Sequence, residues 1–179
     1  MEKTMKIISV VSILALICFS LAYLFTDVNF FLTLAITFGT VAYHFCIRLI
    51  VGSFFNIIMK NKADYTKKWY RVSDSEQKLY KALKVKKWKS RLPTYDKDIF
   101  DASKHSWDEI AQAMCQSELV HEVNILFSFV PVIASVWFGE FAVFLITSVL
   151  GAAFDLMFVF MQRYNRPRVI KLINRKQMY

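Results

Sequence analysis

The chain has 179 residues, of which 56% are hydrophobic and 16% are aromatic. A membrane-spanning helix needs about 20 mostly apolar residues, and the sequence contains four runs of this kind, which a soluble domain would not need. The net charge of +9 would suggest nucleic-acid binding in a soluble protein, but the excess of Lys and Arg on cytoplasmic segments explains it in a membrane protein. We therefore expect an all-α polytopic membrane protein with four transmembrane helices, one domain over residues 1–179 and no nucleic-acid partner.

The first two apolar runs lie in the N-terminal third of the chain. Residues 7–25 predict a transmembrane helix, because this run is longer than the hydrophobic region of a signal peptide and has a poor cleavage site. The second run extends over residues 28–59, so we place the span at 28–50 and expect it to continue as an interfacial helix. His44 and Arg48 lie four residues apart in this run and therefore share one face of the helix.

Residues 60–117 form the long polar segment of the chain and contain 14 of its 23 Lys and Arg residues. The Ser-Asp-Ser-Glu run at 73–76 has the spacing of a capping box and predicts a helix start. Lysines alternate with apolar residues from there to Trp88, which predicts a basic amphipathic helix in the headgroup layer that ends before Pro93. The Ser-Trp-Asp-Glu run at 106–109 predicts a second start, for a helix that continues into the third span.

The third and fourth spans form a hairpin. We place them at residues 119–138, with a kink at Pro131, and at residues 141–161, with a turn at Gly139 and Glu140 between them. Residues 162–179 then form a basic tail.

The distribution of Lys and Arg predicts the orientation in the membrane. Two lie in the N-terminal stretch, 14 in the long polar loop and six in the tail, whereas the two short connections contain none. Basic residues accumulate on the cytoplasmic side of membrane proteins. We therefore expect a multi-pass protein of the cell membrane in which both termini and the long loop are cytoplasmic.

Three ionisable residues, Glu118, His121 and Glu122, lie where the third span begins. Their offsets of three and four residues place them on one helix face, and ionisable groups at membrane depth usually have a function. A partly desolvated histidine beside a carboxylate has the pKa and the fixed tautomer that a general base needs. We predict that His121 is a catalytic base oriented by Glu118 or Glu122; a merely polar helix end is the alternative interpretation.

A metal site is the competing interpretation of the same residues. Glu118 and His121 form the Glu-x-x-His unit of di-metal carboxylate sites, but such sites need two units and the sequence contains one. His44 and Asp155 would complete a mononuclear site only if the fold brought them close. We therefore expect no metal and no other cofactor.

The Gln-Arg-Tyr-Asn-Arg-Pro-Arg run at 162–168 follows the fourth span. Its guanidinium groups match the geometry of phosphate, so we predict that the run binds a phosphate or a lipid headgroup, with a simple positively charged anchor as the alternative. The residues concerned are Arg163, Tyr164, Asn165, Arg166 and Arg168.

His44 and Arg48 are ionisable residues inside an apolar helix, so they should face the helix bundle or a polar cavity. Arg48 is predicted to pair with Asp155, Glu118 or Glu122 in a structural ion pair, or to belong with His44 to the substrate site.

Three motifs occur in a fixed order: Lys-Val-Lys-Lys-Trp-Lys at 84–89, Ser-Glu-Leu-Val-His at 117–121, and the arginine-containing run at 162–168. Together they resemble the glycosyl-4,4'-diaponeurosporenoate acyltransferase family, small bacterial membrane proteins of staphyloxanthin-type carotenoid biosynthesis, over roughly residues 67–172. The resemblance implies acylation of a sugar hydroxyl on a glycosylated carotenoid by an activated long-chain fatty acid. Trp88, in the first motif, joins the candidate substrate-binding residues.

The sequence thus favours a membrane acyltransferase that acts at the cytoplasmic leaflet. Its expected partners are the lipid bilayer, an amphipathic hydroxyl acceptor and a long-chain acyl donor, which is acyl-CoA, acyl carrier protein or a phospholipid. Arg48, Tyr164 or Asn165 would stabilise the negative charge that develops on the carbonyl oxygen. The alternatives are a non-catalytic lipid-binding or partner membrane protein and a metal-dependent membrane enzyme.

Overall fold

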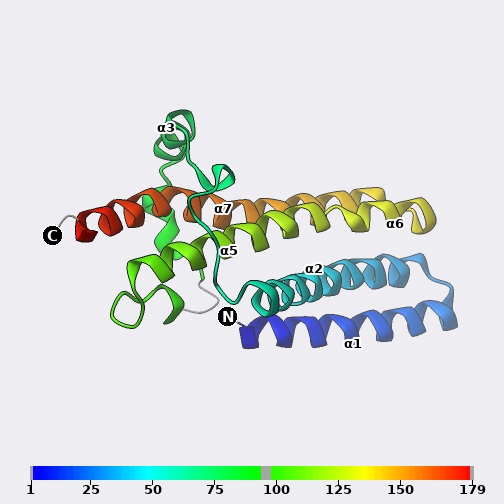
Figure 1. Ribbon diagram of the computed structural model, residues 1–179. Helices are drawn as coiled ribbons and strands as arrows, with labels where there is room; N and C mark the ends of the chain where they lie inside the picture. Colours follow the sequence, from blue (N-terminus) through cyan, green and yellow to red (C-terminus); the bar gives the residue numbers. More distant parts are fainter. Residues whose placement is uncertain (1, 94–97, 178–179) are drawn as a thin grey trace. The chain divides into compact units, whose positions relative to one another are not determined.

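The computed structural model describes residues 2–93 and 98–177, and the predicted N-terminal segment, loop and tail each include residues outside these ranges. The structure is 84% helical and has no strand among the described residues, which confirms the predicted all-α class (Figure 1). The elements in chain order are α1 (Glu2–Thr26), α2 (Asn29–Met59), the 3-10 helix η1 (Lys68–Tyr70), α3 (Asp74–Ala82), α4 (Val85–Trp88), the 3-10 helices η2 (Lys89–Arg91) and η3 (Asp98–Phe100), α5 (Trp107–Phe127), α6 (Val130–Phe138) and α7 (Phe141–Gln177).

The chain forms two compact units. Unit 1 comprises Met1–Gly52 and Val123–Phe154, and unit 2 comprises Ser53–Glu122 and Asp155–Tyr179. The helices α2, α5 and α7 each contribute residues to both units. The expectation of one membrane domain stays a prediction.

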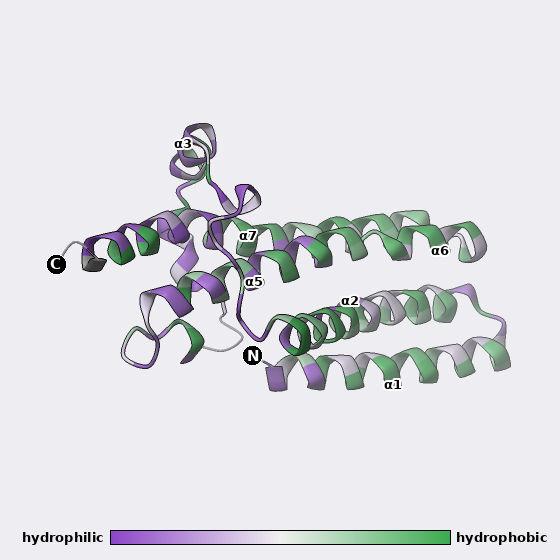
Figure 2. Cartoon of the chain, in the orientation of Figure 1, coloured by the Kyte–Doolittle hydropathy of each residue, from purple (hydrophilic) through white to green (hydrophobic). Residues whose placement is uncertain are grey.

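Four helical segments of the described chain are long and apolar enough to cross a membrane: Glu2–Thr26, Asn29–Met59, Trp107–Phe138 and Phe141–Arg175. Figure 2 shows hydrophobic residues along α1, α2, α6 and the adjoining part of α7, and hydrophilic residues on α3. Phe25 and Val136 are 86% and 79% exposed, whereas Asp155 is fully buried. An apolar exterior around polar interior groups suits a bilayer, so the structure fits a polytopic membrane protein.

In unit 1, α1 and α2 form a hairpin (Figure 1). Aromatic stacking joins the two helices. The chain turns at Asp27, which has a left-handed φ of 52°. Phe19 of α1 stacks on Phe31 and Phe38 of α2, with ring centroids 6.5 and 5.5 Å apart. The single helix from Asn29 to Met59 confirms that the chain stays helical well beyond residue 50, and the interfacial position of its last part stays a prediction.

The expected interruption at Pro131 separates α5 from α6. Proline has no N–H, so the carbonyl of Phe127, four residues earlier, loses its helical hydrogen bond. The hydroxyl of Tyr43 on α2 donates to this carbonyl at 2.9 Å. A side chain from a neighbouring helix therefore satisfies the backbone group that the proline leaves unpaired.

The predicted turn at Gly139 and Glu140 joins α6 to α7. Both residues have left-handed φ values, 67° and 50°. The Glu140 side chain accepts a hydrogen bond of 2.8 Å from the Thr33 hydroxyl. The turn is thereby attached to α2 within unit 1.

Unit 2 contains both predicted capping boxes. Ser73 Oγ accepts a bond from the Glu76 N–H and the Glu76 side chain accepts one from the Ser73 N–H, at 3.2 and 2.8 Å. Ser106 and Glu109 repeat this exchange at 3.3 and 2.8 Å, and α5 begins at the next residue, Trp107. Both predicted helix starts are confirmed because such caps depend only on local sequence.

The basic helix expected after residue 73 is divided into shorter pieces. Lys84 adopts a left-handed φ of 53°, which ends α3 and begins α4. The Trp88 side chain donates its Nε1 proton to the carbonyl of Leu83 at 3.0 Å and so caps the break. At the other end of the chain, α7 continues through Pro167 to Gln177, so most of the predicted tail is helical.

Candidate functional site

The predicted site residues of the third and fourth spans come together in unit 2. Glu118 and His121 lie one turn apart on α5, and hydrogen bonds join them to residues of α7. Figure 1 shows α5 and α7 running side by side. Groups more than 30 residues apart in the chain thereby form one polar cluster.

The first part of the cluster is an ionic centre, which we define as Glu76, Glu118, Arg163 and Arg166. Glu118 and Arg166 are fully buried. Glu118 accepts a bond of 2.6 Å from Arg163 on one oxygen and a bond from Arg166 on the other. Arg166 also donates to the carbonyl of Tyr70, and its guanidinium lies 5.1 Å from the centroid of that ring. Buried charges need such pairing, and the two acids balance the two bases.

Arg163 connects this ionic centre to the polar loop. It binds the Glu76 carboxylate at 2.9 and 2.8 Å, and it donates to the carbonyls of Trp69 and Arg71 at 3.2 Å each. Burial raises the pKa of Glu76, but bonding to the Ser73 backbone N–H and the adjacent guanidinium outweigh it, so the pKa is lowered overall. The arginine thus fixes η1 and the start of α3 against α7.

The second part is a histidine–aspartate pair. His121 Nδ1 lies 2.8 Å from Asp155 Oδ1. The imidazole stacks on the Phe158 ring, with centroids 4.5 Å apart and planes 8° apart. Asp155 is fully buried, whereas 18% of the His121 side chain is exposed. In the tautomer whose Nδ1 proton bonds to Asp155, Nε2 carries the lone pair that a general base uses.

This pairing corrects the predicted orientation of His121. Glu118 is engaged with two arginines, and Glu122 accepts a bond of 2.9 Å from Trp69 Nε1. The prediction that either glutamate orients the imidazole is therefore wrong, because Asp155 of α7 occupies Nδ1. The signal in the sequence was that Asp155 is the single acid within the fourth apolar run.

The arginines of the run at 162–168 have different environments. Arg163 and Arg166 bind protein carboxylates and carbonyls, unlike the phosphate-binding role expected of them. Arg168 is exposed, donates to the Tyr164 hydroxyl and lies 4.0 Å from the centroid of the Tyr164 ring. Asn165 accepts a bond of 2.6 Å from Lys89, a residue that sequence analysis did not single out.

His44 and Arg48 belong to unit 1. Arg48 donates to the carbonyls of His44 and Gly151 at 2.6 and 2.9 Å, and to the Ser128 hydroxyl at 3.4 Å. A Cβ atom on Gly151 would lie 3.1 Å from both His44 Nδ1 and Arg48 Nη2. A glycine at this position therefore lets α7 approach the two polar side chains of α2.

The side chains that could ligate a metal are dispersed. In residues 2–93 and 98–177, no group of three or more His, Cys, Asp and Glu side chains is placed to hold a metal ion.

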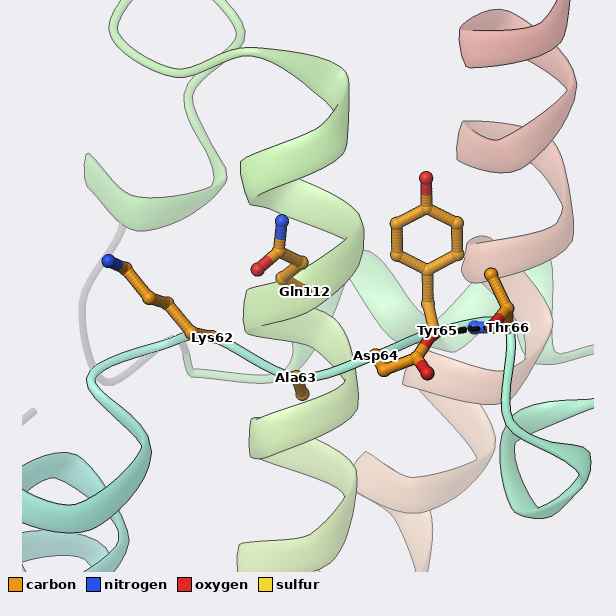
Figure 3. A pocket seen from close by; sticks show the side chains of 6 residues that line it. All are labelled: Lys62, Ala63, Asp64, Tyr65, Thr66 and Gln112. Atoms are coloured by element: carbon orange, nitrogen blue, oxygen red, sulfur yellow. Dashed lines mark hydrogen bonds between the residues drawn. The ribbon is translucent and has the colours of Figure 1, made fainter.

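An open pocket of about 370 Å³ lies beside α5 (Figure 3). It is lined by residues 62–66 and Gln112, none of which was a predicted site residue.

The fold and the cluster define a helical protein with membrane-length helices and a histidine–aspartate pair. A family comparison matches residues 66–175 to glycosyl-4,4'-diaponeurosporenoate acyltransferase. This match covers more than half of the 179 residues, and the chain belongs to that family. The matched region contains the ionic centre and the histidine–aspartate pair, whereas His44 and Arg48 precede it. No curated protein and no solved structure matches the chain.

Proposed function

We propose that the chain is an integral membrane acyltransferase that uses His121 as its general base. It transfers a long-chain acyl group to a hydroxyl of a glycosylated carotenoid or another glycolipid at the cytoplasmic leaflet. The observation that supports this most is the pairing of His121 with buried Asp155 inside the region that the acyltransferase family matches. A partly exposed imidazole with one nitrogen held by a carboxylate has the geometry of a positioned base.

The reaction is a direct acyl transfer. Nε2 of His121 takes the proton of the acceptor hydroxyl while the hydroxyl oxygen attacks the carbonyl carbon of a thioester donor. The tetrahedral intermediate collapses, the carbon–sulfur bond breaks, and the imidazolium returns its proton to the leaving thiolate. With a phospholipid donor, a carbon–oxygen bond breaks instead and the glycerol oxygen takes the proton. Asp155 stabilises the imidazolium that forms between the two proton transfers.

The ionic centre supports this chemistry without contacting the substrate. Glu118, Arg163 and Arg166 hold η1 and α3 against α5 and α7, so we assign them to positioning residues. Because Glu118 and His121 lie on adjacent turns of α5, this attachment also fixes the helix that carries the base. The arginines act on catalysis through α5 and the polar loop.

The proposed topology follows from the basic residues. Both termini and the segment at 60–117 lie in the cytoplasm, because 22 of the 23 Lys and Arg residues belong to these parts. The acyl donor then reaches the site from the cytoplasm or from the inner leaflet, and the acceptor from the bilayer. No nucleic acid, metal or other cofactor takes part.

The test is acyl transfer by the purified full chain in detergent, with labelled acyl-CoA or acyl carrier protein and a glycosylated carotenoid or simple glycolipid. His121→Ala and Asp155→Asn should each lower kcat/KM by about 10²–10⁴-fold, the usual contribution of general acid–base catalysis. His105→Ala is the matched control, because His105 precedes the same helix and pairs with Glu109 at 3.8 Å, away from the site. Wild-type rates for both site variants would contradict the proposal and favour a non-catalytic lipid-binding protein.

A further inference from the structure

Two cations lie against one aromatic ring beside the ionic centre. Lys89 Nζ is 5.4 Å and the Arg168 guanidinium 4.0 Å from the centroid of the Tyr164 ring. Lys89 belongs to η2 in the polar loop, and Arg168 lies one turn after Tyr164 on α7. The bond from Lys89 to Asn165, at 2.6 Å, attaches the loop cation to the residue that follows Tyr164 on α7.

The described residues give the two cations of this group other partners than those of the ionic centre. Among residues 2–93 and 98–177, neither Lys89 nor Arg168 forms an ion pair with a carboxylate. Burial, then the charge of Arg168, then that of Lys86 lower the pKa of Lys89. Like charges repel, so an anion bound near both cations would relieve an unfavourable interaction.

The group also retains hydrogen-bond donors. An ammonium has three donors and a guanidinium has five, and the bonds from Lys89 to Asn165 and from Arg168 to Tyr164 use one donor of each. The Tyr164 hydroxyl accepts from Arg168, so its own proton remains available for another acceptor. The donor groups of Lys89, Tyr164 and Arg168 therefore lie around one aromatic ring.

We propose that Lys89, Tyr164 and Arg168 form an anion site for a phosphate group of the acyl donor. The inference rests on the proposed function, because an acyl donor in the form of acyl-CoA, acyl carrier protein or phospholipid carries phosphate. Guanidinium forks match phosphate oxygens, and an ammonium adds a compact charge. The role expected of three arginines is thus divided: Arg163 and Arg166 stabilise the fold, and Arg168 binds the ligand together with a lysine of the loop.

The test measures binding of coenzyme A to the full chain in micelles of a zwitterionic detergent. Lys89→Met and Arg168→Gln should each weaken binding at least about tenfold, since each removes a charge-assisted contact. Lys87→Met and Arg175→Gln are matched controls that remove the same charge from exposed positions of α4 and α7, and should change binding less than about twofold. Arg168→Lys should recover part of the affinity, because it restores charge but not the fork.

A second measurement distinguishes the sources of phosphate. Displacement of coenzyme A by phosphatidylglycerol, but not by phosphatidylcholine, would assign the site to a lipid headgroup. Displacement by 4'-phosphopantetheine alone would assign it to a soluble carrier, and either result supports the site. Losses in the controls Lys87→Met and Arg175→Gln equal to those in Lys89→Met and Arg168→Gln would overturn it. So would unchanged binding by Lys89→Met and Arg168→Gln, or no binding by the wild type.

The experiment is independent of turnover. His121→Ala should bind coenzyme A like the wild type, so a chain without transfer activity but with charge-specific binding would retain the anion site and lose the proposed function. If Lys89→Met unfolds because its bond to Asn165 is lost, the binding of coenzyme A by Arg168→Gln and Arg168→Lys tests the anion site instead. These two variants are suitable because the Arg168 side chain contacts Tyr164 of its own helix.

Discussion

The interiors of the two units contain different kinds of polar group. In unit 1 the buried polar residues are mostly hydroxyls, such as Ser9 and Thr40, that donate to a carbonyl one turn earlier on their own helix. In unit 2 the fully buried residues include Glu118, Asp155 and Arg166, whose partners come from other elements. These hydroxyls of unit 1 are satisfied within single helices, and its bonds between helices, such as those of Tyr43 and Arg48, go to carbonyls. Unit 2 instead depends on charge pairing between elements.

This difference indicates where each unit is vulnerable. A hydroxyl bonded within its own helix remains satisfied when neighbouring helices shift. A buried charge loses compensation when a partner is removed, because the interior offers no water to replace that partner. Unit 2 should therefore be sensitive to single changes of charge, and unit 1 to changes of shape and of its few contacts between helices.

The largest effect is expected for Glu118→Gln. The change leaves Arg166 fully buried without its carboxylate and should lower the free energy of unfolding by about 3–5 kcal/mol. The measurement is denaturant unfolding of the purified chain in detergent. Lys6→Met is the control, because it breaks an ion pair with Glu2 whose side chains are 62% and 45% exposed, and should leave stability unchanged. Equal stability of both variants would show that unit 2 does not depend on its buried charges.

A change of shape in unit 1 should have the next largest effect. Gly151→Ala places a methyl group 3.1 Å from His44 Nδ1 and Arg48 Nη2, so these side chains must give way by a few tenths of an ångström. We expect a loss of about 1–3 kcal/mol in the same unfolding measurement, as for other overpacked sites. Gly52→Ala is the matched control: a methyl group added there would meet no atom within 4 Å, and helix propensity predicts a small gain. A neutral Gly151→Ala would contradict the close approach.

Removing a contact between helices in unit 1 should cost less. Tyr43→Phe deletes the hydroxyl that bonds the Phe127 carbonyl and should lower stability by about 1 kcal/mol. In a Pro131→Ala background the restored N–H offers that carbonyl its helical partner, so the same change should have a smaller effect. Identical losses in both backgrounds would show that the hydroxyl does not compensate for the proline.

The smallest effect is a pH dependence at the edge of unit 2. Because the pKa of Glu76 is lowered in the fold, its pairing with Arg163 stabilises the protein above the ordinary glutamate range. This contribution is lost as the pH falls through the lowered pKa. Wild type should therefore be more stable than Glu76→Gln at neutral pH, and the difference should disappear in acid. Denaturant midpoints measured from neutral pH downward give the comparison, and a difference independent of pH would contradict it.

The sequence predicts the parts of the structure that depend on local chemistry. The apolar runs, both capping boxes and the break at Pro131 follow from residues within one or two turns of each other. The extension of α7 through Pro167 is harder to predict from the sequence, because a proline favours a helix end unless neighbouring contacts maintain the helix. Such contacts involve Arg163 and Arg166, and they form only when the polar loop packs on α7.

The partners of the site residues could not be read from spacing. Three carboxylates were available to His121, and the nearest in sequence, Glu122 and Glu118, share its helix face. The structure instead uses Asp155, which lies 34 residues away, because the arginines and Trp69 occupy the two glutamates. Sequence spacing therefore located the polar face of α5, but the pairing depended on how α7 and the loop pack against it.

The hydrogen bond from Tyr43 to the Phe127 carbonyl has a consequence for membrane insertion. In the proposed membrane topology lipid tails offer no donor, and the Phe127 carbonyl of α5 obtains its hydrogen bond from Tyr43 of α2. Because translation starts at the N-terminus, α2 reaches the bilayer before α5, so the Tyr43 hydroxyl is already present when α5 inserts. In a circular permutant that is synthesised with α2 last, α5 would have to insert while the Phe127 carbonyl has no hydrogen-bond donor. We expect this permutant to yield less membrane-integrated protein than the natural chain.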